Sequence, residues 1–394
     1  MEAYFDNSAT TRVFDSVRDV VVKVMTEDYG NPSAKHRKGM EAERYVRQAA
    51  ADIAKTLKVK DKEILFTSGG TESNNMALIG TAMANQRAGK HIISTRIEHA
   101  SVYNPLAFLE QQGFEVTYLS VDHKGHISLE ELERSVRPDT ILVSIMYVNN
   151  EMGAIEPVDE IAALIHGKNP NTLFHVDAIQ AYGKLVIRPA KQGIDLLSVS
   201  AHKIHGPKGV GFLYIAPGVK MRPLLYGGGQ QKDMRSGTEN VPGIVGYGKA
   251  VEIAMANMKE RTQKETELRD YLMERVVSEV PFTRINGSRS SRLPNNANFA
   301  FQFIEGESLL IKLDMAGICG SSGSACTSGS LDPSHVLLAI GLPHEIAHGS
   351  LRLTLSEENT REEIDYVVEQ IKEVVAYLRS MSPLYEDYMK HNKQ

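Results

Sequence analysis

The sequence predicts an α/β fold, with a mostly parallel sheet that carries helices on both faces and a smaller α+β domain after it. Two observations predict this fold. Short apolar runs of strand length alternate with segments of helical spacing through the middle of the chain. From about residue 242 the pattern changes to long, charged, amphipathic helices. With 394 residues, the chain is long enough for a large domain and a smaller companion.

The alternation can be followed in chain order. Apolar runs of strand length occupy residues 63–67, 91–95, 141–148, 173–176 and 196–199. Segments of helical spacing between them include residues 72–84 and 159–166. Because strands separated by helices are usually joined by crossovers, this order favours a parallel sheet that is covered on both faces.

The last third of the chain predicts the second domain. A long amphipathic helix is expected over 263–280 and short strands around 298–303. Thr360 and Glu363 have the spacing of a capping box in front of a final helix with an apolar stripe. The domain boundaries that we expect are 15–250 for the large domain and 1–14 with 251–394 for the small domain, which includes a Gly/Ser-rich loop at about 320–333.

Composition excludes several classes of protein. Lys and Arg (44) nearly balance Asp and Glu (49), and no long basic block occurs, so no nucleic-acid partner is expected. No apolar run approaches the roughly 20 residues that span a membrane, and the start has no basic leader, so we expect a cytoplasmic protein without a membrane partner. The two cysteines, Cys319 and Cys326, are too few for a disulfide framework.

Two charged residues follow apolar strands, where an isolated charge is costly. Lys203 lies in a polar cluster before a glycine-rich turn, and forming an imine with an aldehyde would neutralise it. Asp177 ends another apolar run, and a protonated pyridine nitrogen would be a suitable cationic partner. The ordinary alternatives are a surface lysine in a loop and an aspartate that caps a helix.

A glycine turn between a strand and a helix could bind an anion. Gly69, Gly70 and Thr71 follow the apolar run at 63–67 and precede the predicted helix. Backbone N–H groups and the helix dipole converge on an anion such as phosphate at this kind of turn. The segment matches neither the nucleotide P-loop nor the dinucleotide fingerprint, and by itself it is weak evidence.

These segments, taken in order, resemble the NifS/IscS-type cysteine desulfurases, which belong to the class V aminotransferase family of pyridoxal-phosphate enzymes. The resemblance implies the aspartate-aminotransferase-like fold and pyridoxal 5'-phosphate as cofactor. It covers nearly the whole chain. The matching segments are 4–11 (YFDNSATT), 31–33 (NPS), 67–73 (TSGGTES), 98–99 (EH), 149–153 (NNEMG), 175–180 (HVDAIQ), 200–203 (SAHK) and Arg352.

The resemblance implies a role for each matching residue around the cofactor. Lys203 forms a covalent imine with the cofactor, Asp177 pairs with the pyridine nitrogen, and Gln180 contacts the ring hydroxyl. His99 stacks on the ring and helps in proton transfer, although a lone histidine is more often structural. The glycine turn and the strand before Lys203 hold the phosphate through Gly70, Thr71, Ser200 and His202. Thr238 reaches into the site of a neighbouring subunit, which implies a homodimer.

The resemblance also implies where the substrate and its sulfur bind. Asn149 and Arg352 engage the amino acid, and a planar guanidinium suits its carboxylate. Cys326, among small Gly and Ser residues, is the expected nucleophile for sulfur, because a thiolate in a flexible loop can reach the substrate and then an acceptor. The alternative is a buried structural cysteine. Cys319 is expected to be structural, with a resolving role as the alternative.

The implied reaction converts L-cysteine to L-alanine and leaves a persulfide on Cys326, with Lys203 as the base. An iron–sulfur scaffold or another sulfur-acceptor protein would receive the sulfur. No metal site is expected beyond a transient iron–sulfur contact through Cys326. A selenocysteine lyase, an aminotransferase and a non-catalytic sulfur-delivery adaptor remain as alternatives, and the sequence does not name the acceptor.

Overall fold

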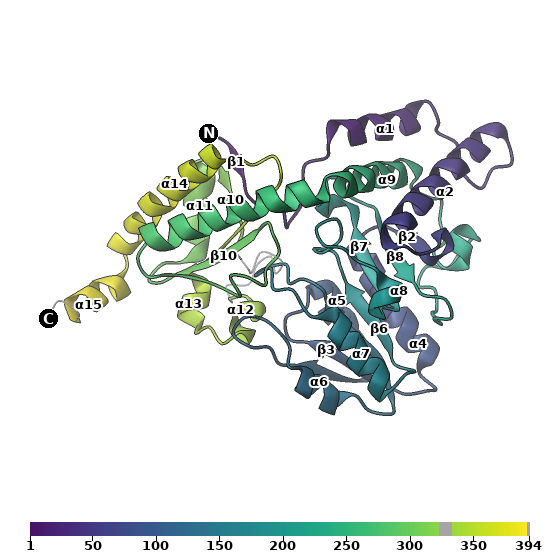
Figure 1. Ribbon diagram of the computed structural model, residues 1–394, viewed down its shortest axis with the longest axis horizontal. Helices are drawn as coiled ribbons and strands as arrows, with labels where there is room; N and C mark the ends of the chain where they lie inside the picture. Colours follow the sequence, from purple (N-terminus) through teal and green to yellow (C-terminus); the bar gives the residue numbers. More distant parts are fainter. Residues whose placement is uncertain (323–332, 392–394) are drawn as a thin grey trace.

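The larger sheet lies in the right-hand half of the molecule as drawn in Figure 1. The structure is a computed structural model that describes residues 1–322 and 333–391. Within these ranges the sheet has seven strands, and only β8 runs antiparallel to its neighbours. In sheet order the strands are β2 (Ile64–Thr67), β8 (Gly211–Ile215), β7 (Leu196–Ser200), β6 (Leu173–Asp177), β5 (Thr140–Met146), β3 (His91–Thr95) and β4 (Glu115–Leu119). The prediction of a mostly parallel sheet is confirmed.

Helices cover both faces of this sheet, as predicted. One face packs against α2 (Arg37–Leu57), α7 (Val158–Lys168) and α9 (Val241–Ala256). The other face packs against the helical stretch 70–85 and α5 (Ala100–Gln111). The stretch 70–85 consists of α3 (Gly70–Asn75), one π-helical segment (Met76–Gly80) and α4 (Thr81–Asn85). The remaining helices of this part are α1 (Asp15–Thr26), which packs on α9, α6 (Leu129–Ser135) and α8 (Pro189–Gln192).

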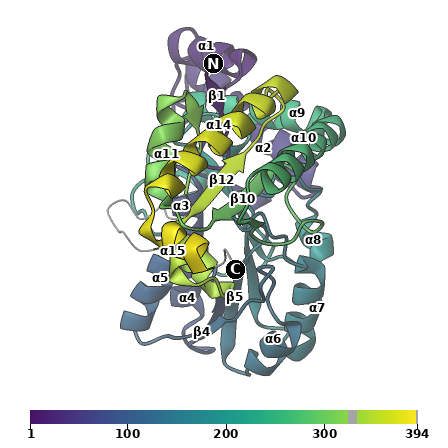
Figure 2. The same ribbon diagram turned by 90° about the vertical axis from the view of Figure 1, so that its left-hand side faces the viewer.

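A second, antiparallel sheet belongs to the last third of the chain. Among the described residues it has three strands, in the order β12 (Ser350–Thr354), β10 (Asn296–Phe301) and β9 (Thr283–Ile285). Figure 2 shows α10 (Met258–Glu279), α11 (Gly306–Met315) and α14 (Arg361–Ser380) beside this sheet. Leu272, Leu313 and Ile364 from these helices share a buried apolar cluster with Phe299 of β10.

The first residues of the chain join this second core. β1 (Ala3–Tyr4) pairs in parallel with β11 (Ile318–Cys319), and Phe5 is completely buried in the same apolar cluster. The short helices α12 (His335–Ala339) and α13 (His344–His348) and the last helix α15 (Pro383–His391) complete this part. Within the described ranges, no helix is both long enough and apolar enough to cross a membrane.

We propose that the two apolar cores correspond to two domains with the boundaries expected from the sequence, 15–250 and 1–14 with 251–394. The buried apolar residues of α9 pack with the first core and those of α10 with the second. The pairing of β1 with β11 supports the assignment of the first residues to the small domain.

The amino terminus of α14 has the capping box that the sequence predicts. The Thr360 hydroxyl accepts a hydrogen bond from the Glu363 main-chain N–H (3.2 Å). The Glu363 carboxylate accepts one from the Thr360 N–H (2.9 Å). The box satisfies two main-chain donors that the first helical turn leaves unpaired.

We expect Thr360→Ala to lower the free energy of unfolding by about 1 kcal/mol, because the Glu363 N–H loses its acceptor. Urea unfolding followed by circular dichroism measures the change. The matched control is Thr266→Ala within α10, where the hydroxyl bonds only to the Thr262 carbonyl of the same helix and the alanine costs little. Equal stability of the Thr360→Ala variant and the unmodified protein would contradict the role of the cap.

Candidate active site

A cavity of about 340 Å³ lies where strands of the large sheet end and β12 of the second sheet approaches. The carboxyl ends of parallel strands meet at one edge of a sheet, which gathers the residues that follow them. Nine residues predicted for the site line this cavity: Gly70, Thr71, His99, Asp177, Gln180, Ser200, His202, Lys203 and Arg352.

Lys203 follows β7 in a short 3₁₀ turn and contacts the amino-terminal segment. Its Nζ donates hydrogen bonds to the carbonyl oxygens of Ser8 (2.6 Å) and Ala9 (2.8 Å). The Gln180 side-chain amide donates to the same Ser8 carbonyl (3.0 Å). The segment around Ser8 therefore forms part of the cavity wall and fixes the positions of two predicted cofactor residues.

Asp177 ends β6 as a buried carboxylate, with 4% of its surface exposed. Its Oδ1 accepts a hydrogen bond from the Ile179 N–H (3.0 Å) and its Oδ2 accepts one from the Asn74 side chain (2.8 Å). Burial raises the pKa of Asp177, and these hydrogen bonds and the charges of His99 and Lys203 oppose the rise. A cation bound in the cavity would favour the ionised carboxylate further.

His99 precedes α5 and caps its first turn. Its Nδ1 accepts a hydrogen bond from the Ser101 N–H (3.1 Å) and lies 2.8 Å from the Ser101 hydroxyl. Burial lowers the pKa of His99, and Lys203 and His335 lower it further, whereas Asp177 raises it. The imidazole is therefore neutral at physiological pH.

Hydroxyl, imidazole and main-chain donors gather at another part of the wall. Thr71 lies in the first turn of α3, and Ser200 ends β7. The pKa of His202 is lowered to about 4 by burial, so its ring is neutral, and its Nδ1 lies 3.2 Å from the Thr10 hydroxyl. A Cβ atom at Gly70 would lie 2.2 Å from the end of the Ile179 side chain, which would have to move to admit it.

These residues fit pyridoxal 5'-phosphate. Lys203 supplies an amine for an aldehyde, and the buried Asp177 carboxylate suits a protonated pyridine nitrogen. The Gln180 Oε1 atom is buried and has no hydrogen-bond partner among the described residues, so a polar ligand group could satisfy it. Hydroxyl and imidazole donors beside a helix start suit a phosphate.

Arg352 reaches the cavity from β12, with 5% of the residue exposed. Its Nη2 pairs with the Asp6 carboxylate (2.9 Å), and its Nη1 donates to the Asn150 carbonyl (3.1 Å). Its Nε is buried and has no partner in the described parts of the chain. A guanidinium held in this way can bind the carboxylate of an amino acid.

Two predicted site residues do not line the cavity. The Asn149 amide donates to the Ile97 carbonyl (3.0 Å), and its oxygen accepts from the N–H groups of Glu151 and Met152, so the side chain supports the loop, and Asn150 lines the cavity instead. Thr238 is exposed outside the cavity. Arg235, three residues earlier, pairs with Glu72 of α3 (2.9 Å).

The predicted nucleophile, Cys326, lies outside the described residues, as does most of its loop. Before it, Ser321 lines the cavity and exchanges two main-chain hydrogen bonds with Arg352 (3.1 and 2.6 Å). Cys319 lies in β11, away from the cavity lining, and burial raises the pKa of its thiol. This environment does not favour a thiolate.

Sequence reasoning assigned no role to Asp6, Asn74 or Ser101, although each contributes to the site. Asp6 lies in the matching segment 4–11 and Asn74 directly follows the segment 67–73. Their place in or beside segments of the family resemblance was the available signal for Asp6 and Asn74, and the sequence analysis had no such signal for Ser101. The partner of each could be known only from the fold.

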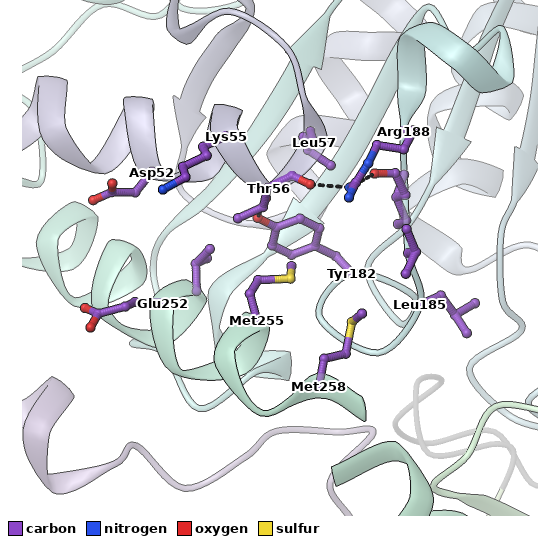
Figure 3. A pocket seen from close by; sticks show the side chains of 13 residues that line it. Asp52, Lys55, Thr56, Leu57, Tyr182, Leu185, Arg188, Glu252, Met255 and Met258 are labelled. Carbon is purple, nitrogen blue, oxygen red and sulfur yellow. Dashed lines mark hydrogen bonds between the residues drawn. The ribbon is translucent and has the colours of Figure 1, made fainter. Parts of the chain in front are cut away.

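A larger cavity, of about 540 Å³, lies between the ends of α2 and α9 (Figure 3). The Tyr182 hydroxyl bonds to Thr56 there, and Arg188 donates to the Thr56 carbonyl. None of the described residues that line it was predicted for the site. In residues 1–322 and 333–391, no cluster of three or more His, Cys, Asp or Glu could hold a metal ion.

Comparison with known proteins shows the family of this chain. Residues 3–367 match the family model described as aminotransferase class-V, and the chain belongs to that family of pyridoxal-phosphate enzymes. The chain is 50% identical over 395 residues to a protein named cysteine desulfurase IscS from Clostridium botulinum, covering 100% of this chain and 99% of that one.

Solved structures of related proteins also resemble this chain in fold and sequence. A NifS-like protein is 42% identical, with a TM-score of 0.91, and the match covers 96% of this chain and 100% of that one. A structure titled SspA in complex with cysteine is 35% identical, with a TM-score of 0.81, and covers 91% and 100%. Pyridoxal 5'-phosphate is thus the cofactor of this enzyme.

Glu98, next to His99, is a completely buried acid. Its Oε1 accepts hydrogen bonds from the Thr95 hydroxyl (2.7 Å) and the Met146 N–H (3.0 Å). Burial raises its pKa to about 8, and the nearby charges of Asp177 and Glu156 raise it too. Glu98 is therefore protonated in the folded protein at neutral pH.

The raised pKa of Glu98 predicts a pH-dependent stability. Between pH 4.5, the ordinary pKa, and about 8, the unfolded chain loses this proton and the folded protein keeps it. The contribution of Glu98 to stability therefore falls by about 1.4 kcal/mol per pH unit as the pH rises through this window. Glu98→Gln, which cannot ionise, should gain stability relative to the unmodified protein from pH 5 to 8 in urea unfolding. Glu110→Gln, at an exposed position of α5, is the control, and a difference that stays constant with pH would contradict the assignment.

Proposed function

We propose that the protein is a cysteine desulfurase that converts L-cysteine to L-alanine and passes the sulfur, through Cys326, to an acceptor protein. One observation carries this proposal. A single cavity brings together Lys203, Asp177, His99 and Arg352. The chain that forms this cavity is 50% identical over its full length to a protein named as a cysteine desulfurase. A related structure, titled as a complex with cysteine, supports cysteine as the substrate.

Each cavity residue has a task in this reaction. When bound, pyridoxal phosphate supplies an aldehyde and an electron-withdrawing ring that stabilises negative charge on the amino acid. Lys203 would hold the cofactor covalently and, once released by the substrate amine, take the α-proton at Nζ. Asp177 would keep the pyridine nitrogen protonated, and His99 would stack on the ring and assist proton movement.

The phosphate and the substrate carboxylate bind at different places. Gly70, Thr71, Ser200 and His202 would hold the phosphate, and Gln180 would contact the ring hydroxyl. Arg352 would bind the substrate carboxylate through its buried Nε, which has no partner among the described residues, while the Asn150 carbonyl and the Asp6 carboxylate hold Nη1 and Nη2 in place. The main-chain pairing of Arg352 with Ser321 would bring the start of the cysteine loop beside the substrate.

Cys326 would act on the substrate sulfur. Its thiolate attacks that sulfur, an S–S bond forms, and the C–S bond breaks with its electron pair left on carbon. The carbon then takes up a proton and alanine leaves, so that the persulfide stays on Cys326. An acceptor thiol can then receive the outer sulfur, and an iron–sulfur scaffold is the acceptor that the family resemblance suggests.

A homodimer in the cytoplasm is the form that we propose for the enzyme. Thr238 is exposed and is not among the residues that line its own cavity, which is compatible with a role in the site of a second copy. The Arg235–Glu72 pair would hold this segment next to Thr71.

Lys203→Ala should abolish the reducible covalent link to the cofactor. Borohydride treatment followed by intact mass measurement is expected to show the added cofactor mass on the unmodified protein and none on this variant, with alanine release at least 100-fold slower. Lys208→Ala, at an exposed position five residues later, should behave as the unmodified protein. A retained adduct in Lys203→Ala would overturn the assignment.

Cys326→Ser should stop sulfur transfer while leaving the cofactor bound. After incubation with L-cysteine, mass spectrometry of the unmodified protein should show one added sulfur on the peptide that contains Cys326. The variant should show none and should lose at least 100-fold in alanine formation. Cys319→Ala is the matched control and should keep both signals. Alanine formation by Cys326→Ser at the unmodified rate would show that another group takes the sulfur.

A further inference from the structure

Asn74 links two residues of the active site. Its side chain is completely buried, and its Nδ2 lies 2.8 Å from the Asp177 Oδ2 and 2.9 Å from the Ser101 hydroxyl oxygen. The Asp177 carboxylate is an acceptor, so it fixes the amide group of Asn74 with Nδ2 facing it. Both protons of Nδ2 are then used, one by Asp177 and one by Ser101.

Ser101 connects Asn74 to His99 through its hydroxyl group. Because its hydroxyl oxygen accepts a proton from Asn74, its single O–H is left to donate, and the His99 Nδ1 lies 2.8 Å away. The main-chain N–H of Ser101 also donates to the same Nδ1 (3.1 Å). A main-chain N–H can only donate, so Nδ1 carries a lone pair and no proton.

The remaining ring nitrogen must carry the proton of the neutral imidazole. Burial lowers the pKa of His99 and so supports the neutral form. The positive charge of Lys203 and the nearby His335 also lower this pKa, whereas the charge of Asp177 raises it. Protonation of Nδ1 would lose both hydrogen bonds from Ser101. Nε2 therefore bears an N–H, and it is the nitrogen left to face the cavity that His99 lines.

We propose that Asn74 and Ser101 are positioning residues that hold His99 as a neutral imidazole with its proton on Nε2. In this state His99 can donate a hydrogen bond to a group in the cavity, but it has no vacant nitrogen there to accept a proton. His99 then assists proton movement only as a hydrogen-bond donor, and Lys203 Nζ carries the proton. This relay of hydrogen bonds also couples the His99 ring to Asp177, since the Asn74 amide binds both Asp177 and Ser101, and Ser101 binds the ring.

The tautomer of His99 can be measured directly, whatever reaction the protein catalyses. Only the catalytic role that we give to this tautomer rests on the proposed function. Holoenzyme labelled with ¹⁵N in its histidines gives long-range ¹H–¹⁵N correlation spectra that distinguish bare from protonated ring nitrogens, and His99→Gln assigns the His99 signals. At pH 7 we expect a bare Nδ1 and a protonated Nε2 in the unmodified protein. A proton on Nδ1 in the unmodified protein, either in a neutral ring or in a doubly protonated imidazolium, would by itself overturn the proposal.

Ser101→Ala removes one of the two donors to Nδ1 and keeps the main-chain N–H. The His99 titration in the same spectra should then shift upward by about one pH unit, and Ser101→Thr, which keeps the hydroxyl, should restore it. Ser94→Ala is the matched control, because that buried hydroxyl donates only to the Ser144 carbonyl outside the cavity lining. An unchanged His99 titration in folded Ser101→Ala would refute the relay. An enzyme that fails to release alanine from cysteine yet shows the expected tautomer would refute only the proposed function.

Discussion

The buried carboxylate of Asp177 is the interaction on which the arrangement of the site depends. A carboxylate with 4% exposure is stable only when hydrogen bonds and a cationic partner replace the lost water. Ile179 and Asn74 supply the hydrogen bonds, and the pyridine nitrogen of the cofactor suits the cationic partner. The same Asn74 amide binds Ser101 and so reaches His99. One buried charge thus organises the half of the cavity that we propose for the cofactor ring.

The other half depends on segments far apart in the chain. Ser8 accepts hydrogen bonds from Lys203 and Gln180, and Asp6 pairs with Arg352. The amino-terminal segment is held at this place because β1 pairs with β11 and Phe5 is buried in the second core. Arg352 and Lys203 therefore contact the same amino-terminal segment, which neither of their own strands provides.

Local sequence patterns predicted much of the fold because the forces behind them are local. The apolar run at 91–95 coincides with β3. The helix expected over 263–280 ends one residue after α10 (Met258–Glu279), which begins five residues earlier than expected. The capping box of Thr360 and Glu363 forms as predicted, since its two hydrogen bonds join residues three positions apart. By contrast, the π-helical segment at Met76–Gly80 has no signature that the periodicity could detect.

The sequence by itself predicted the fold class through its periodicity, because apolar spacing follows local secondary structure, and its resemblance to a known family implied the cofactor and half of the residues that line the cavity. Only the tertiary structure decided which side chains meet. It turned Asn149 toward the Ile97 carbonyl and brought Asn150 to the cavity, it paired Asp6 with Arg352 across 346 positions, and it set Ser101 against His99. These choices depend on the direction of each side chain and on the packing of distant segments, which neither composition nor spacing encodes.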